Sequence, residues 1–493
     1  MRHARKALLL GLAAALVGGV ATAQQVDFSR YVALGDSYCA GFSNLSLLQK
    51  HQLNSYPAIL ARQAGFTGTF QQPLISEPGI PAELALTALH VVGGQVSPVI
   101  GPKSSSMGLP INITYPSIYN NLGIPGAAVH NLIATTGNAN NLQSDAVLYA
   151  QGKIGTAQLF ADIVLRFPVL PGTTTPATAL AQAIAAQGTF YTVEVGGDDV
   201  IDAVLSGVVV DGVTMTTKAS FQADYTTLLG ALRQQRPSAT IVVMNVSDMT
   251  EWPFARAIKP YIVNPATGAH IPLIGEAGPL TEQDLVTLNA SPLLAKGIGI
   301  PKAAGGTGLP LPEGSIDATG LHAGVILRAA EVAAIRARLA DINQVISAVA
   351  AQFGAKVWDI NAFWANIVAG NYLIGGIPIS SAFLTGGFFG YDGFHPTELG
   401  YAIIANDLVK TINAQLGTKV PEVNLRPFLE GGATAGATSV MAATTTLSQQ
   451  AAVGIVKAYI PTALTDKLEV NTHVIRRRIA ERPDRGPAGQ IIP

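Results

Sequence analysis

Residues 31–38 have the sequence YVALGDSY, which joins a buried strand to a reactive side chain. The apolar run from Tyr31 to Leu34 has the length and composition of a strand covered on both faces. Gly35 and Asp36 then interrupt the run and precede Ser37. We therefore expect a strand that ends at a loop or helix carrying Ser37.

Outward from this stretch, strand-length runs alternate with helical patterns. Residues 189–195 and 240–246 are β-branched and apolar, as strands are. Between Val332 and Phe353 apolar residues recur every three or four positions, which predicts one long amphipathic helix. Further helices are expected near 55–64, 221–235 and 397–416, a second strand near 121–126, and another strand near 356–360. This alternation predicts an α/β fold, a three-layer α/β/α sandwich with a mostly parallel sheet. Functional side chains are then expected at the carboxyl ends of the strands.

The two ends of the chain differ from its middle. Basic residues precede an apolar stretch over 7–20, and Ala21-Thr22-Ala23 has the small-x-small form of a cleavage site, so residues 1–23 are predicted to be a signal peptide. We expect one main domain over 24–425, with large loop insertions near 66–118 and 250–325. Residues 426–493 form a low-complexity C-terminal extension. The predicted location is secreted, or periplasmic and associated with the cell envelope, with no transmembrane span after signal cleavage.

Composition excludes some classes of function. Only 12% of the 493 residues are charged and the formal net charge is −1, so no nucleic-acid partner is expected. Cys39 is the single cysteine, which excludes an internal disulfide. Because one thiol at one position is a weak signal of chemistry, we predict that Cys39 is a small buried side chain.

Near the other end of the chain, Asp392 precedes His395 by three residues. A serine hydroxyl is a weak nucleophile until a base accepts its proton, and that base needs a partner that fixes its tautomer. Ser37, His395 and Asp392 supply these three roles as nucleophile, general base and orienting acid. If Pro396 is the first helical residue, His395 lies at a helix N-terminus.

These motifs resemble the GDSL, or SGNH, family of serine esterases and lipases. The resemblance rests on Gly35-Asp36-Ser37-Tyr38, on the Gly123-Ile124-Pro125-Gly126 turn, and on Asp392 with His395-Pro396. It implies a flavodoxin-like sheet and an enzyme that hydrolyses esters through an acyl-enzyme, without a cofactor or a metal. Ser37, Gly126 and the residue at position 198 would form the oxyanion hole. The substrate would be a small-molecule, lipid or acylated-carbohydrate ester.

The sequence departs from the family at position 198. The family has Gly-x-Asn-Asp, in which the asparagine amide donates to the oxyanion, whereas this chain has Gly196-Gly197-Asp198-Asp199. An ionised carboxylate has no proton to donate. Two outcomes stay open: burial and Asp199 keep Asp198 protonated and restore a donor, or only the Ser37 and Gly126 N–H groups remain. The second outcome implies a slow esterase or a catalytically inactive binding protein of the cell envelope.

Overall fold

The structure is a computed structural model that describes residues 26–430, apart from 93–94, 152, 265 and 318–319. The predicted signal peptide and nearly all of the predicted extension lie outside the described residues. Within the described residues, no helix combines the length and the apolar character that crossing a bilayer requires.

The centre of the fold is a five-stranded parallel sheet in the order β15-β6-β5-β1-β4. Its strands are β1 (Tyr31–Gly35), β4 (Asn121–Gly123), β5 (Phe190–Glu194), β6 (Thr240–Met244) and β15 (Lys356–Trp358). Numbered along the chain, this is the flavodoxin-like order 2-1-3-4-5. Gly35, the last residue of β1, pairs with Gly123 on one side and with Glu194 on the other. The sequence after β1 therefore begins at the point where the strand order reverses, which is the usual ligand position in such sheets.

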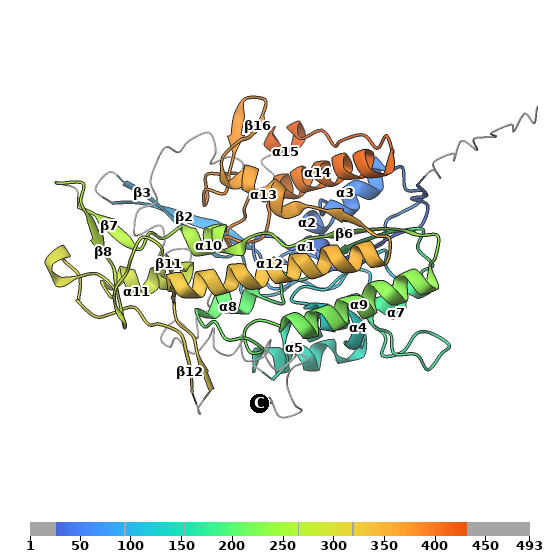
Figure 1. Cartoon of the computed structure of the whole chain (residues 1–493), viewed down its shortest axis with the longest axis horizontal. Helices are drawn as coiled ribbons and strands as arrows, with labels where there is room; N and C mark the ends of the chain where they lie inside the picture. Colours follow the sequence, from blue (N-terminus) through green and yellow to red (C-terminus); the bar gives the residue numbers. More distant parts are fainter. Residues whose placement is uncertain (1–25, 93–94, 152, 265, 318–319, 431–493) are drawn as a thin grey trace, which may run out of the picture.

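Helices cover both faces of this sheet (Figure 1). One layer contains α3 (Tyr56–Gln63) and α14 (Glu398–Leu416), and the other contains α4 (Val129–Ala134), α7 (Ala179–Ala185), α9 (Lys218–Gln235) and α12 (Ala329–Gln352). The apolar stripe of α12 is buried, as its spacing predicts. The three-layer α/β/α fold with a parallel sheet is thus confirmed. Shorter helices are α1 (Ser37–Ala40), α2 (Gln49–Gln52), α5 (Leu142–Ala150), α6 (Thr156–Val164), α8 (Ile201–Ser206), α10 (Pro253–Arg256), α11 (Ser291–Ala295), α13 (Ile360–Val368) and α15 (Arg426–Glu430).

The first long insertion contains an antiparallel hairpin of β2 (Leu84–Val92) and β3 (Gln95–Pro102). No sustained period marks this hairpin in the sequence. The ladder shifts register between Leu86 and Ala88, and such a bulge breaks the alternation of a strand.

The second long insertion is built from short antiparallel pairs at one end of the molecule (Figure 1). They are β7 (Tyr261–Val263) with β8 (His270–Pro272), β9 (Ile274–Gly275) with β10 (Gly278–Pro279), β11 (Leu285–Val286) with β14 (Ile326–Leu327), and β12 (Ser315–Asp317) with β13 (Gly320–His322). A small apolar cluster that includes Leu273, Val286 and Leu311 lies beneath them. A last pair, β16 (Tyr372–Ile374) with β17 (Ile377–Ile379), follows α13.

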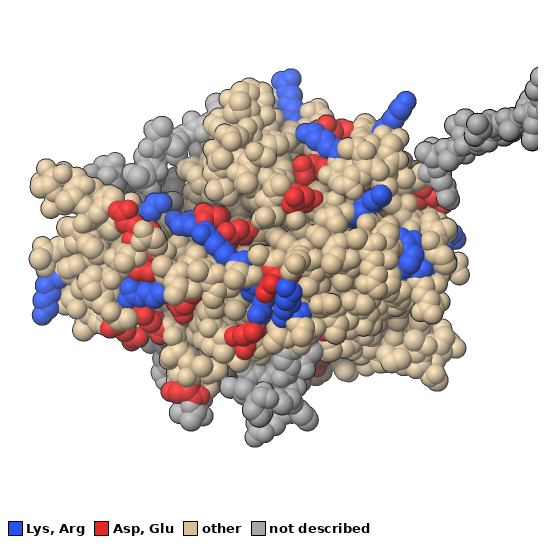
Figure 2. Space-filling view, viewed as in Figure 1, with Lys and Arg blue, Asp and Glu red and all other residues tan. Residues whose placement is uncertain are grey.

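Ion pairs attach α12 to neighbouring segments. Arg328 contacts Asp284 of the second insertion at 3.1 Å, and Arg336 contacts Asp248 at 2.9 Å. Figure 2 shows basic and acidic side chains interspersed on this face, many of them along α12 and the insertion. The long helix therefore connects the sheet to the insertion.

Candidate active site

Ser37 is the first residue of α1 and follows β1 after a sharp turn. Gly35 is required there, because a side chain on Gly35 would lie 2.3 Å from the carbonyl oxygen of Glu194 on the adjacent strand. Asp36 caps the new helix: its Oδ1 accepts a hydrogen bond from the Tyr38 N–H at 2.9 Å. The first N–H groups of a helix have no intrahelical acceptor, so the Ser37 N–H stays available to a ligand.

The structure brings Ser37, His395 and Asp392 together although 358 positions separate the serine from the histidine. The Ser37 Oγ lies 3.0 Å from His395 Nε2, and His395 Nδ1 lies 2.8 Å from Asp392 Oδ2. Because an ionised Asp392 only accepts, the imidazole proton is on Nδ1, and Nε2 is left to accept from the serine hydroxyl. The three side chains are thus hydrogen-bonded in sequence, from Ser37 through His395 to Asp392.

Asp392 is fully buried and surrounded by donors. Its Oδ1 accepts from the N–H groups of Phe394 (3.0 Å) and His395 (2.8 Å), and its Oδ2 accepts from Leu45 N–H (2.7 Å). Burial by itself would raise the pKa of Asp392, but the charge and hydrogen bonds of His395, with the Phe394 N–H, outweigh it and lower that pKa. Asp392 is therefore ionised at neutral pH.

Aromatic side chains enclose the histidine. The rings of Phe394 and Phe42 lie 4.7 and 4.9 Å from the His395 ring, which is 6% exposed. Tyr38, next to the serine, donates its hydroxyl to the Phe394 carbonyl at 2.6 Å. The nucleophile segment and the histidine loop are thus directly connected.

His395 does not lie in the first turn of a helix, so that expectation was wrong. Thr397 is the N-cap of α14, and its Oγ1 accepts from Gly400 N–H at 3.0 Å. Pro396 and His395 precede the cap. A threonine side chain satisfies a free helical N–H, which proline cannot do, and this moves the helix start past the proline.

The loops after β4 and β5 flank the serine on either side, because both strands pair in parallel with β1. Gly126, after β4, has φ +86°, and a side chain there would contact Thr156 at 2.8 Å. Among the described residues, no backbone carbonyl outside the helices and strands accepts a hydrogen bond from the Gly126 N–H. Asp198, after β5, is 8% exposed. Both residues therefore lie at the edge of the sheet that carries Ser37.

Comparison with known proteins agrees with this arrangement. Residues 31–408 match the family described as GDSL-like Lipase/Acylhydrolase. The chain belongs to the GDSL-like lipase/acylhydrolase family. No curated protein sequence matches the chain.

Three solved structures match the chain at low identity. A Parabacteroides merdae protein described as GDSL-like is 11% identical, with 79% of this chain and 99% of that chain covered and a TM-score of 0.31. Phospholipase A1 from Streptomyces albidoflavus is 14% identical, and an extracellular lipase from Streptomyces rimosus is 16% identical; each match covers 78% of this chain and 98% of the other, with a TM-score of 0.29. At these values the structural likeness does not establish a shared activity.

One feature of this GDSL-like site was not predicted from the sequence. Glu194, the last residue of β5, is buried beneath the nucleophile turn, where its Oε2 accepts from Cys39 N–H at 3.0 Å. Burial, and secondarily the charge of Asp36, raise the pKa of Glu194 well above its ordinary value. Of the Glu194–Asp36 pair, Glu194 is therefore the member whose protonated form is favoured. In the sequence, the only sign of this feature is one glutamate within an apolar run, and that pattern does not indicate which residue the glutamate contacts.

The remaining site predictions concern Cys39 and metals. Cys39 is buried and free, as predicted, and burial raises the pKa of its thiol well above the ordinary value. Its Sγ donates weakly to Asn121 Oδ1 at 3.3 Å. Over the part of the chain that the structure describes, no group of three or more His, Cys, Asp or Glu side chains is placed to hold a metal ion.

Proposed function

We propose that the protein is an exported serine ester hydrolase, a carboxylesterase, lipase or deacetylase. The observation that carries the proposal is the continuous hydrogen-bonded path from Ser37 Oγ through His395 to the buried Asp392. Membership of the GDSL-like lipase/acylhydrolase family supports the same reaction class.

In the proposed reaction, Ser37 Oγ attacks the ester carbonyl carbon while His395 Nε2 accepts the hydroxyl proton. Asp392 stabilises the imidazolium that forms. The tetrahedral intermediate collapses, and the alcohol leaves with the proton from His395. Water then attacks the acyl-enzyme, again giving its proton to His395, and the acid is released from Ser37.

The N–H groups of Ser37 and Gly126 would hold the negative oxygen of the intermediate. Preorganised donors of this kind are among the largest contributions to acyl-transfer catalysis. The role of Asp198 depends on its protonation. A protonated Asp198 adds a third donor, whereas an ionised one opposes the oxyanion.

Asp198 also favours one alternative, a weakly active or inactive binding protein of the cell envelope on the same scaffold. The two functions are separated by hydrolysis of p-nitrophenyl acetate and butyrate, and by labelling with a fluorophosphonate. We expect a burst of p-nitrophenol and a labelled serine that are both lost in Ser37→Ala. Ser238→Ala is the matched control, because Ser238 is exposed and lies just before the first residue of β6, at the opposite edge of the sheet. Equal rates in wild type and Ser37→Ala would eliminate the enzyme.

The acyl and alcohol parts of the substrate follow from a second measurement. Rates over a series of p-nitrophenyl esters from acetate to palmitate would separate a deacetylase, with a maximum at the shortest chain, from a lipase, with a maximum at longer chains.

A further inference from the structure

We infer that Asn44 is a positioning residue that holds the Asp392 loop in register with His395. This inference rests on the proposed function, because it concerns the acid of the same Ser37 site. No motif points to Asn44, which lies seven positions after the serine in a turn between α1 and α2.

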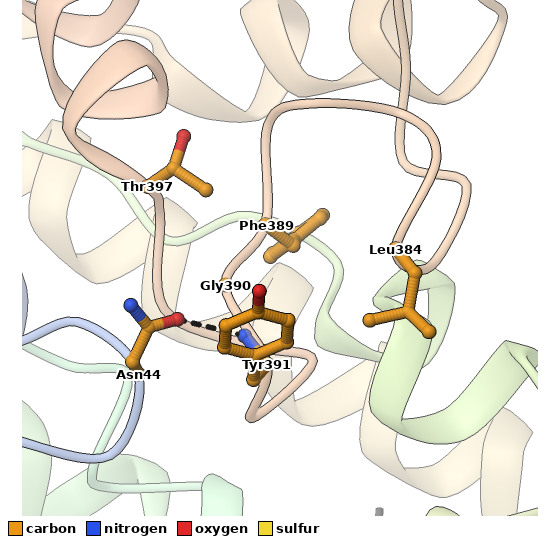
Figure 3. A pocket seen from close by; sticks show the side chains of 6 residues that line it. All are labelled: Asn44, Leu384, Phe389, Gly390, Tyr391 and Thr397. Carbon is orange, nitrogen blue, oxygen red and sulfur yellow. Dashed lines mark hydrogen bonds between the residues drawn. The ribbon is translucent and has the colours of Figure 1, made fainter. Parts of the chain in front are cut away.

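Asn44 and Leu45 form hydrogen bonds to two consecutive residues, Tyr391 and Asp392, of the loop that carries the acid (the acid loop, residues 390–395). Asn44 Oδ1 accepts from Tyr391 N–H at 2.9 Å, the contact drawn in Figure 3. Leu45 N–H then donates at 2.7 Å to Asp392 Oδ2, the same oxygen that faces His395 Nδ1. One turn therefore fixes both the backbone before the acid and the carboxylate itself.

The turn has an unusual backbone. Asn44 and Leu45 have φ of 49° and 57°, and Ser43 and Ser46 exchange backbone hydrogen bonds at 2.9 and 3.0 Å. Two positive φ values between paired residues are typical of a type I′ turn, in which asparagine is favoured and leucine is not. A leucine with positive φ is strained, and such conformations persist where the surroundings impose them.

The surroundings of Asn44 are polar and buried. Its side chain is 2% exposed, and its Nδ2 donates to Glu83 Oε1 at 3.4 Å. The backbone carbonyl of Asn44 accepts a hydrogen bond from the Leu84 N–H at 3.0 Å. Lys50 contacts the same Glu83 oxygen at 2.7 Å. Glu83 and Leu84 of the first long insertion thus hold Asn44 in place through these hydrogen bonds.

The acid loop passes in direct contact with this amide. A side chain on Gly390 would lie 2.6 Å from Asn44 Oδ1. Gly390 N–H donates to the His395 carbonyl at 2.8 Å, which closes the loop around Asp392. Figure 3 shows Asn44, Gly390 and Tyr391 lining one small hollow with Thr397 at its edge. Ser37 is not among the lining residues, so Asn44 acts through Asp392 and not on the substrate.

Removing the amide would leave Tyr391 N–H buried without its acceptor and release the loop. Displacement of a reacting group by about 1 Å costs on the order of 10²-fold in rate. A misplaced Asp392 also stabilises less well the His395 imidazolium that forms as Ser37 gives up its proton. We therefore expect kcat to fall with little change in KM.

The test compares Asn44→Gly with Asn120→Gly. Glycine keeps the left-handed backbone at position 44 and removes only the amide. Asn120 also makes two side-chain hydrogen bonds: its Nδ2 donates to the Tyr31 carbonyl at 2.9 Å, and its Oδ1 accepts from the Gln71 N–H at 3.0 Å. These bonds lie beside the first residue of β1, at the edge of the sheet opposite to Ser37. We expect both variants to lose stability. Only Asn44→Gly should lower kcat, by about 10- to 100-fold, with little change in KM.

A second variant reverses the polarity of the contact with Glu83. In Asn44→Asp/Glu83→Gln, the aspartate still accepts from Tyr391 N–H and receives a hydrogen bond from the glutamine amide. We expect this double variant to recover most of the wild-type kcat. If Asn44→Gly does not fold, the double variant is the deciding test. A double variant that folds but has a kcat as low as that of Ser37→Ala overturns the inference.

Failure of the inference can be told from failure of the proposed function. The proton NMR resonance of the His395 Nδ1–H reports its hydrogen bond to Asp392 even where no ester is hydrolysed. An unchanged Nδ1–H resonance together with an unchanged kcat in Asn44→Gly overturns the positioning role. Wild type without Ser37-dependent hydrolysis, but with a shifted or lost Nδ1–H resonance in Asn44→Gly, overturns the enzyme and retains the positioning role.

Discussion

Replacing Asp198 by asparagine tests the feature in which this chain departs most from its family. The change keeps the size of the side chain and exchanges a carboxyl group for an amide that donates. Asp198 is 8% exposed, so bulk water screens its charge poorly. One oxyanion donor is worth about 10²–10³ in kcat, or roughly 3–4 kcal/mol. We expect Asp198→Asn to raise kcat for p-nitrophenyl butyrate by about 10- to 10³-fold, with a smaller change in KM.

The pH dependence of this gain distinguishes the two states of Asp198. If the wild-type carboxyl is protonated and donates, the ratio of variant to wild-type kcat is near one at low pH and grows as the proton is lost. If it is ionised throughout, the ratio is large and constant. Asp199→Asn is the control for charge alone, because Asp199 is also buried but its Oδ2 accepts from Val129 N–H at 3.0 Å. A fall in kcat for Asp198→Asn, or an equal gain in Asp199→Asn, would refute the reasoning.

Three further predictions concern stability. Because the pKa of Glu194 is raised in the folded protein, the unfolded chain loses this proton at a lower pH than the folded chain does. The free energy of unfolding of the wild type should therefore fall as pH rises above about 4.5. Glu194→Gln can still accept from the Cys39 N–H and should remove this fall, as measured by urea unfolding at pH 5 and 9. Burial opposes ionisation of Glu83, but its partners His51 and Lys50 outweigh burial and lower its pKa from 4.5 to about 2. The free energy of unfolding of the wild type should therefore fall by about 3 kcal/mol as pH drops from 4.5 to about 2. Glu83→Gln should not show this loss. Thr397→Ala should lower the unfolding free energy by about 1–2 kcal/mol, because it removes the N-cap of α14.

Two of these predictions have a matched control variant. Glu422→Gln changes an exposed glutamate and should leave the acid unfolding profile as in wild type. Thr397→Ser keeps the cap hydroxyl and should recover most of the loss measured by thermal unfolding. Equal pH slopes in wild type and Glu194→Gln would contradict the raised pKa of Glu194.

Much of the fold could be predicted from the sequence because burial leaves a local pattern. Parallel strands covered on both faces give apolar runs such as residues 31–34 and 240–246, and a helix on a sheet gives the three-and-four spacing of Val332 to Phe353. The β2–β3 hairpin escaped because its bulge breaks the alternation that marks a strand. The helix predicted near 397–416 is present as α14, but its first turn excludes Pro396 and His395, because threonine at the cap competes with proline as a local signal for the helix start.

By itself, the sequence determined the candidate reactive groups: a serine after a strand, an acid three residues before a histidine, and an aspartate at position 198, where the family resemblance leads us to expect asparagine. Only the tertiary structure decided their partners. The hydrogen bond from the Asp36 N–H to Glu194 Oε2 joins residues 158 positions apart, and the hydrogen bond from the Tyr391 N–H to Asn44 Oδ1 joins residues 347 positions apart. Periodicity records which face of an element is buried, but a hydrogen bond between distant segments depends on how the sheet and loops converge, and no local pattern carries that information.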